Sequence, residues 1–139
     1  MSIITSLIAK HPDVVLCEYS DFTGNFKQIT RIILQRLKPN CKYSIDYDKY
    51  KLFYINENKI TYLCLTEDIS SSTAFSFLED LKKKILKTYK NEELLNFKAD
   101  ELNGFTDELK SLMVYYLIWF DLTCLRKFIY FILIYFYLI

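Results

Sequence analysis

Residues 59–67 read KITYLCLTE, and the pattern of this short stretch decides the fold. Successive side chains of a strand point to opposite faces of a sheet. Here both faces are apolar, with Ile60, Tyr62 and Cys64 on one and Leu63 and Leu65 on the other. Residues 50–56, YKLFYIN, repeat the two-sided pattern, and a tight turn around Glu57-Asn58 would join the two strands into a hairpin. Such a hairpin needs helices on both faces of its sheet.

Three more strands precede this hairpin in the chain. Residues 2–10 and 13–20, SIITSLIAK and DVVLCEYS, flank His11-Pro12, where the proline supplies a turn. Residues 42–48, KYSIDYD, alternate between apolar and polar side chains. This last segment therefore predicts a strand with one apolar face only.

The helices that could cover the sheet are also present. Residues 25–38 carry an apolar face ending before Pro39, and Asn25 with Gln28 resembles a capping box. Residues 71–90 carry a second apolar stripe: Ala74, Phe77, Leu78, Leu81 and Ile85. A third helix begins near Asn103 or Thr106, with core spacing at Phe105, Leu109 and Leu112. The predicted order is β-β-α-β-β-β-α-α, an α+β class.

Length and composition exclude several classes of protein. The chain has 139 residues, the size of one domain, and its 18 basic and 17 acidic residues give no electrostatic case for nucleic acid. Two glycines and two prolines argue against disorder. The N-terminus, MSIITSLIAKHPD, lacks the basic region and long apolar core of a signal peptide, so we expect the chain to face the cytosol.

Neither the cysteines nor the acidic residues indicate a catalytic or metal site. Cys17, Cys41, Cys64 and Cys124 form no CxxC pair, and the single His11 has no cysteine at ligand spacing. We expect no metal or cofactor, and structural thiols in a reducing compartment. No glycine-rich loop or nucleophile motif is present, so the sequence predicts a protein that is not an enzyme.

Four segments carry a resemblance to a known family: GNFKQITRIIL at 24–34, YKLFYI at 50–55, KITYLCLTED at 59–68 and AFSFLEDLKKKILKTY at 74–89. They resemble the longin domain of synaptobrevin-like R-SNAREs, most closely the endosomal and vacuolar branch. The resemblance covers residues 1–114. It implies a longin or profilin-like fold, in which a five-stranded antiparallel sheet has one helix on one face and two on the other.

The resemblance also implies a function. Longin domains are non-catalytic regulatory and sorting modules of vesicle-trafficking proteins at the cytosolic face of endosomal, vacuolar or vesicle membranes. Their partners are SNARE helices, in cis or in trans, and peptides from coat adaptors or accessory factors, which bind a groove between the first helix and the third strand. An edge strand beside an apolar stripe can accept such a segment. The alternative is a longin scaffold subunit without a SNARE motif, or a tail-anchored longin protein.

In this sequence the groove candidates are the apolar residues of that strand and helix: Tyr43, Ile45, Tyr47, Ile29, Ile32, Ile33 and Arg36. The competing interpretation is that these residues close the core. A second candidate surface is the lysine cluster of Lys82, Lys83, Lys84 and Lys87, which could contact anionic lipid. A solvated helix face interleaved with Glu79 and Asp80 is the alternative for the lysines.

Residues 115–139 form a hydrophobic tail that departs from the family. A synaptobrevin-like SNARE would continue into a heptad repeat with a central arginine, whereas residues 112–139 carry only three charges, at Asp121, Arg126 and Lys127. A membrane anchor over 113–139 is long enough but would bury these charges at about 2.5 to 3.5 kcal/mol each. An extended third helix, or translated non-coding sequence from an AT-rich genome, are the other two interpretations.

Overall fold

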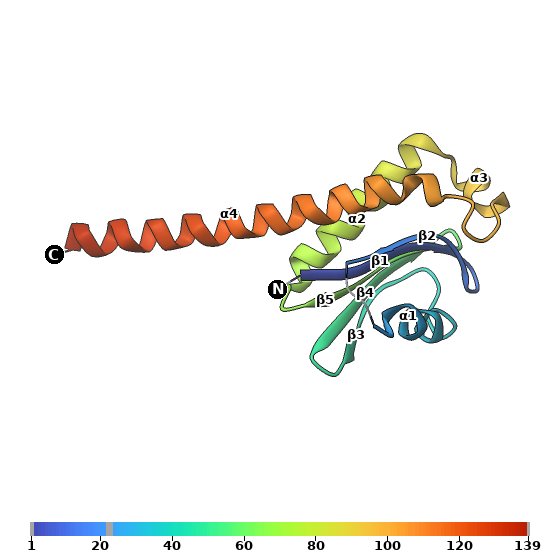
Figure 1. The fold of residues 1–139 in the computed structure, drawn as a ribbon, viewed down its shortest axis with the longest axis horizontal. Coiled ribbons are helices and arrows are strands. Elements are labelled where there is room, and N and C mark those ends of the chain that lie inside the picture. Colours follow the sequence, from blue (N-terminus) through green and yellow to red (C-terminus); the bar gives the residue numbers. More distant parts are fainter. Residues whose placement is uncertain (1, 22–23, 139) are drawn as a thin grey trace.

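The computed structural model describes residues 2–21 and 24–138 and confirms the predicted α+β class (Figure 1). Its strands are β1 (Ser2–Lys10), β2 (Val14–Ser20), β3 (Lys42–Tyr47), β4 (Tyr50–Glu57) and β5 (Ile60–Glu67). Its helices are α1 (Phe26–Leu34), α2 (Ser71–Thr88), α3 (Asn91–Asn96), the short 3-10 helix η1 (Asn103–Phe105) and α4 (Thr106–Leu138). The short α3 and η1 were not predicted.

The five strands form one antiparallel sheet in the order β2-β1-β5-β4-β3. The opening stretch is therefore its central strand, and every residue from 60 to 66 is buried. The hairpin before it turns at Asn58 and Lys59, which both have positive φ, at 51° and 66°. The turn thus lies one residue later than predicted.

The sheet carries an apolar core on each face. On one face α1 contributes Leu34, which packs in a cluster with Leu7, Leu52 and Leu63. On the other face α2, α3 and α4 contribute to a cluster that includes Phe77, Leu94 and Leu109, together with Cys64 of β5. Figure 1 shows the same division, with α1 on one side of the sheet and α2 and α4 on the other.

The two edges of the sheet differ. Along β2, the backbone N–H of Asp100 donates to the carbonyl of Val15 at 2.9 Å, and that of Leu102 donates to Leu16 at 3.1 Å. This segment covers the β2 edge. β3 pairs only with β4 among the described residues, so β3 presents the open edge of the sheet.

Helix α1 is shorter than predicted. It ends at Leu34 rather than at residue 38, because the chain turns at Arg36, whose N–H donates to Ile33 O, and Lys38 N donates to the hydroxyl of Tyr54 in the sheet. The predicted capping box is wrong as well. Asn25 is the N-cap residue, but it lacks the extended backbone of a capping residue, and its side chain makes no cap hydrogen bond.

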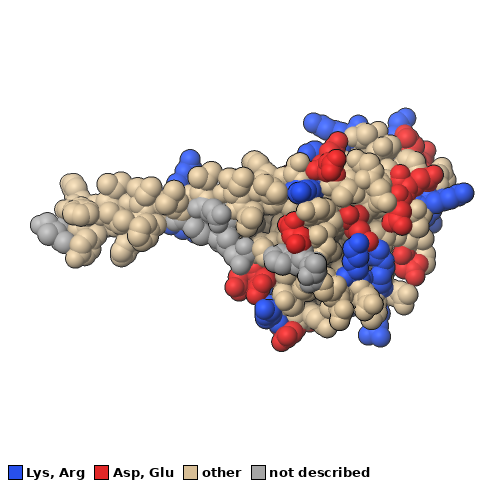
Figure 2. Space-filling model, viewed as in Figure 1, with Lys and Arg blue, Asp and Glu red and all other residues tan. Residues whose placement is uncertain are grey.

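Helix α4 runs unbroken from Thr106 to Leu138 and leaves the domain part-way along its length (Figure 1). Its last buried side chain is Tyr116. Beyond it the described side chains are exposed, apart from the half-buried Ile132, and the projecting part carries few charges in Figure 2. The side chains of Asp121 and Cys124 lie outside the described residues. Within the described residues, no helix combines the length and apolarity needed to cross a bilayer.

Candidate functional site

The apolar side chains of β3 lie on the face of the sheet that α1 covers. Tyr43 pairs with Tyr54 of β4, and Ile45 pairs with Leu52. Both partners belong to the core beneath α1. The neighbouring Lys42 points to the opposite face, where its ammonium forms an ion pair with Glu79 of α2. The predicted alternation of β3 is therefore present, and its apolar face lies toward α1.

Residues 26–38, which comprise α1 and the start of the loop after it, run in the direction opposite to β3. At one end the rings of Phe26 and Tyr50 meet edge to face at 5.4 Å between centroids, and Tyr50 is the register partner of Tyr47, the last residue of β3. At the other end Lys38 places its ammonium 5.6 Å from the ring centroid of Tyr43. We give the name α1–β3 seam to the surface that lies between these two contacts and is formed by α1, the loop after it and β3.

The predicted groove residues divide into two groups along this seam. Ile33 and Ile45 are half-buried and pack against the core cluster, so they close the interior, and Ile29 is also half-buried. The outer group is exposed: Ile32 by 55%, Tyr43 by 52% and Tyr47 by 43%, with Arg36 also exposed. The structure therefore exposes two large apolar side chains on the open edge strand, Tyr43 and Tyr47, and a third, Ile32, on α1. Their role in binding stays a prediction.

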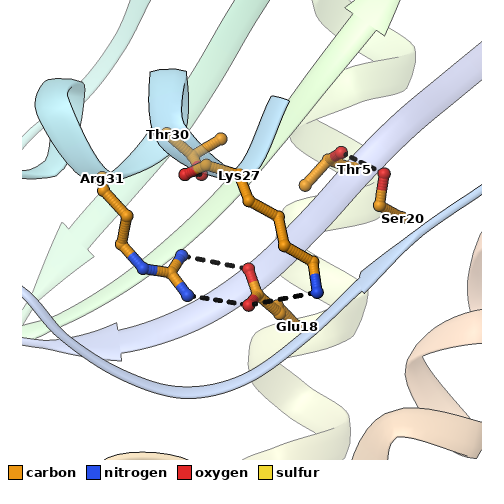
Figure 3. Close-up of polar contacts among 6 residues, drawn as sticks. All are labelled: Thr5, Glu18, Ser20, Lys27, Thr30 and Arg31. Atoms are coloured by element: carbon orange, nitrogen blue, oxygen red, sulfur yellow. Dashed lines mark hydrogen bonds and ion pairs between the residues drawn. The ribbon is translucent and has the colours of Figure 1, made fainter. Parts of the chain in front are cut away.

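An ion pair that the sequence analysis missed holds α1 in place (Figure 3). Arg31 donates from both terminal nitrogens to Glu18 of β2, at 3.0 and 2.7 Å, and Lys27 lies 3.9 Å from the same carboxylate. Bidentate arginine–carboxylate pairs fix orientation as well as distance. The sequence did contain an indication of this pair. Side chains alternate along β2, and Cys17 packs on the α2 face of the sheet, so the next residue, Glu18, must point toward α1.

The loop between α1 and β3 is anchored on Tyr54. The Tyr54 hydroxyl accepts from Lys38 N at 3.2 Å and lies 3.6 Å from the Cys41 sulfur. Burial, helped by the hydrogen bond with Cys41, raises the pKa of Tyr54, so the phenol stays neutral. Asn56 secures the same loop through its side-chain oxygen, which accepts from Asn40 N at 3.0 Å.

The predicted lysine cluster is not uniform. Lys82 is half-buried and forms ion pairs with Glu57 at 2.8 Å and Glu79 at 3.0 Å. The hydrogen bond to Glu57 raises the pKa of Lys82, and the hydrogen bond from Lys42 lowers the pKa of Glu79. Lys82 thus joins α2 to the sheet. Lys83, Lys84 and Lys87 form no ion pair with any described residue, and their contact with an anionic surface stays a prediction.

The described residues give no sign of a metal site. No group of three or more His, Cys, Asp or Glu side chains among them is arranged to hold a metal ion. The half-buried carboxylate of Glu18 is paired with Arg31. What the α1–β3 seam provides is an apolar strip next to unpaired backbone, a combination suited to an extended or helical peptide.

Comparison with known proteins gives a family match across most of the chain. Residues 16–109 match the profile of the longin family, described as a regulated-SNARE-like domain. Vesicle-associated membrane protein 7B of Dictyostelium discoideum is 35% identical over 118 residues, which are 84% of this chain and 45% of that protein. Mouse vesicle-associated membrane protein 7 is 34% identical over 91 residues, 64% of this chain and 41% of that protein.

A plant relative extends the same pattern. Putative vesicle-associated membrane protein 726 of Arabidopsis thaliana is 32% identical over 117 residues, which are 82% of this chain and 53% of that protein. The chain therefore spans about half the length of the curated relatives that it matches.

Proposed function

The chain belongs to the longin family, and from this premise we propose that it is the regulatory and sorting domain of a SNARE-type vesicle-trafficking protein. The relatives are SNARE proteins, a non-enzymatic family, and the chain is not an enzyme. The proposed partners are SNARE helices and peptides of coat adaptors or accessory factors. The proposed location is the cytosolic face of endosomal, vacuolar or vesicle membranes.

One observation carries this proposal: Tyr43 and Tyr47 are exposed on β3, the open edge of the sheet, and Ile32 is exposed on α1, the helix that covers the same face. Large apolar side chains in contiguous exposed patches mark interaction sites. The β2 edge is covered by residues 100–102, so the seam is the place where a partner segment could add to this sheet. The fully covered central strand β5 then serves as scaffold, with binding on the outside.

The proposal assigns the two ends of the chain different roles. Residues 1–114 are the proposed longin domain, and the first turn of the segment after them still packs on it through Tyr116. Residues 115–139 are the proposed apolar tail, whose part beyond Trp119 would be available for membrane association or for a second protein.

A binding assay tests the seam directly. The probe is a synthetic peptide with the SNARE motif of a synaptobrevin-like R-SNARE, titrated into the wild-type chain and into Tyr43→Ser and Ile32→Ser. Each substitution should weaken binding by about 5- to 30-fold, because a truncated interface side chain outside a hot spot costs about 1 to 2 kcal/mol.

Leu86→Ser is the matched control. Leu86 is 39% exposed but lies on α2, on the opposite face of the sheet, so its substitution should leave the affinity unchanged. If all three variants bind as the wild type does, the seam is not the binding surface.

A further inference from the structure

A cavity of about 320 Å³ lies between α2 and α4, on the face of the sheet opposite the α1–β3 seam. Its volume is at the lower end of the range typical of small-molecule and side-chain sites. One wall consists of hydroxyl side chains of α2, and the other consists of aromatic side chains of α4. A single ionisable carboxylate, that of Asp80, completes the lining.

The Asp80 carboxylate is not neutralised by any described residue. It accepts a hydrogen bond from the hydroxyl of Tyr116, but no lysine, arginine or histidine nitrogen of the described residues lies within ion-pair distance. The neighbouring Glu79 differs, because Lys42 and Lys82 both pair with it. Asp80 therefore presents to the cavity a carboxylate that no cationic side chain of the described residues pairs with.

The aromatic wall favours a positive charge in the same place. Tyr116 lies between Tyr115 and Trp119, with ring centroids 5.6 Å and 6.5 Å away and planes inclined by 76° and 55°. The faces of tryptophan and tyrosine rings attract cations, and a planar guanidinium can also stack on them. Aromatic wall and carboxylate thus select for the same sign of charge.

The hydroxyl wall distinguishes between classes of cation. Ser72 and Ser76 lie one turn apart on α2 and face the cavity, where their oxygens can accept hydrogen bonds. A quaternary ammonium group has no N–H to donate and would leave these oxygens unused, whereas a guanidinium has five donors in a fixed plane. An anion is disfavoured, because Asp80 repels it and the α2 N-terminus is already capped by Ser70, which accepts from Thr73 N at 3.2 Å.

We infer that this cavity binds the guanidinium group of an arginine side chain from a partner polypeptide, stacked on Trp119 and paired with Asp80. The site lies on the opposite face from the seam and does not depend on what the seam binds. A partner could engage either surface alone or both together.

The chain supplies its own reporter, because Trp119 is its only tryptophan. The tryptophan fluorescence of the full chain is followed while the capped tripeptide acetyl-Gly-Arg-Gly-amide is added. We expect a saturable change with the arginine peptide, a several-fold weaker response with the lysine peptide, and none with the uncharged citrulline peptide. No saturable change with arginine, or equal binding of the lysine or citrulline peptide, would overturn the inference.

Variants test the assigned contacts. Asp80→Asn keeps an oxygen that can accept from Tyr116 but removes the charge, and we expect about tenfold weaker binding of the arginine peptide. Glu92→Gln, an exposed carboxylate on α3, is the control and should change nothing. Unchanged affinity in Asp80→Asn would contradict the site.

A second variant covers the case in which Asp80→Asn does not fold. Ser76→Ala substitutes an exposed position of α2 with a better helix former, so it should fold. A several-fold loss of arginine binding in Ser76→Ala supports the site, and wild-type affinity overturns it.

Discussion

Leu63 and Tyr43 are both apolar, yet they lie in opposite environments. Leu63 is fully buried in the central strand, whereas Tyr43 is 52% exposed at the sheet edge. Leu63→Ser should lower the free energy of unfolding by about 3 to 5 kcal/mol, because it leaves a cavity and adds a hydroxyl to the interior. Tyr43→Ser should cost about 1 kcal/mol or less, since little buried area is lost. Urea unfolding of both variants checks this, and equal losses would place Tyr43 in the core.

The two buried cysteines should react far more slowly than Cys41. Burial raises the pKa of Cys17 to about 12 and raises that of Cys64 as well. The thiolate is the reactive form, and an ordinary thiol has a pKa of about 8.5. In the folded chain at neutral pH, iodoacetamide should modify the half-buried Cys41 before Cys17 and Cys64, which should react only after unfolding. Peptide-resolved mass spectrometry measures each site separately, and fast labelling of Cys64 would contradict its burial.

The same shifts set a pH dependence of stability. Because both folded-state pKa values lie above the ordinary value, folding favours the protonated thiols. Their contribution to stability is fully present below about pH 8.5 and is lost as the pH rises toward 12. Cys64→Ala should therefore flatten the alkaline fall in melting temperature, although it also lowers stability throughout. An alkaline fall as steep as in the wild type would show that Cys64 does not contribute.

At the scale of elements, the start of α2 depends on one hydroxyl. Ser70 has the extended backbone of a capping residue, and its oxygen accepts from Thr73 N. Ser70→Ala should lower stability by about 1 kcal/mol. Ser71→Ala, at the next position along, is the control and should be close to neutral. Thermal melting of the two variants checks this, and equal effects would mean that the cap contributes nothing.

The position of α1 depends on the pair of Arg31 and Glu18. Arg31→Met would leave the Glu18 carboxylate, whose side chain is only 12% exposed, without its bidentate partner. The expected loss is about 1.5 to 3 kcal/mol. Lys27→Met is the control, since Lys27 lies 3.9 Å from the same carboxylate with its side chain 66% exposed, and it should cost less than about 1 kcal/mol.

A double-mutant cycle between Arg31→Met and Glu18→Gln separates the pair from its surroundings. A coupling energy near zero, measured from the unfolding free energies, would show that the pair does not hold α1.

The element boundaries show what sequence patterns can and cannot predict. The apolar stripe of α2 was predicted residue by residue, because its spacing is local and Ala74, Phe77 and Leu81 are all buried. The predicted capping role of Asn25 is wrong, because an asparagine can precede a helix without its side chain accepting a hydrogen bond from the helix backbone. The Arg31–Glu18 pair joins residues 13 apart in the chain, and periodicity in one element cannot reveal such a partner.

For the whole molecule, the same division between local and long-range information applies. The two-sided pattern of residues 60–65 predicted a strand covered on both faces, and the burial of residues 60–66 between two apolar cores confirms it. That β3 is an edge strand followed only from the resemblance. The residues alone could not show that the β2 edge is covered, because residues 100–102, which cover it, lie more than 80 residues later in the chain. Tyr43 and Tyr47 were predicted as groove residues, but the structure was needed to separate them, as exposed side chains, from Ile33 and Ile45, which pack against the core.

The binding face of the whole domain is tested most directly by hydrogen–deuterium exchange, measured with and without the SNARE-motif peptide. The proposed function predicts slower exchange along α1 and β3, at residues 26–38 and 42–47, because a bound segment would shield the seam and pair with the open edge. The central strand β5 and helix α2 should exchange as before. Protection confined to α2 and α4, with α1 and β3 unchanged, would contradict the proposal that this domain binds its partners along the α1–β3 seam.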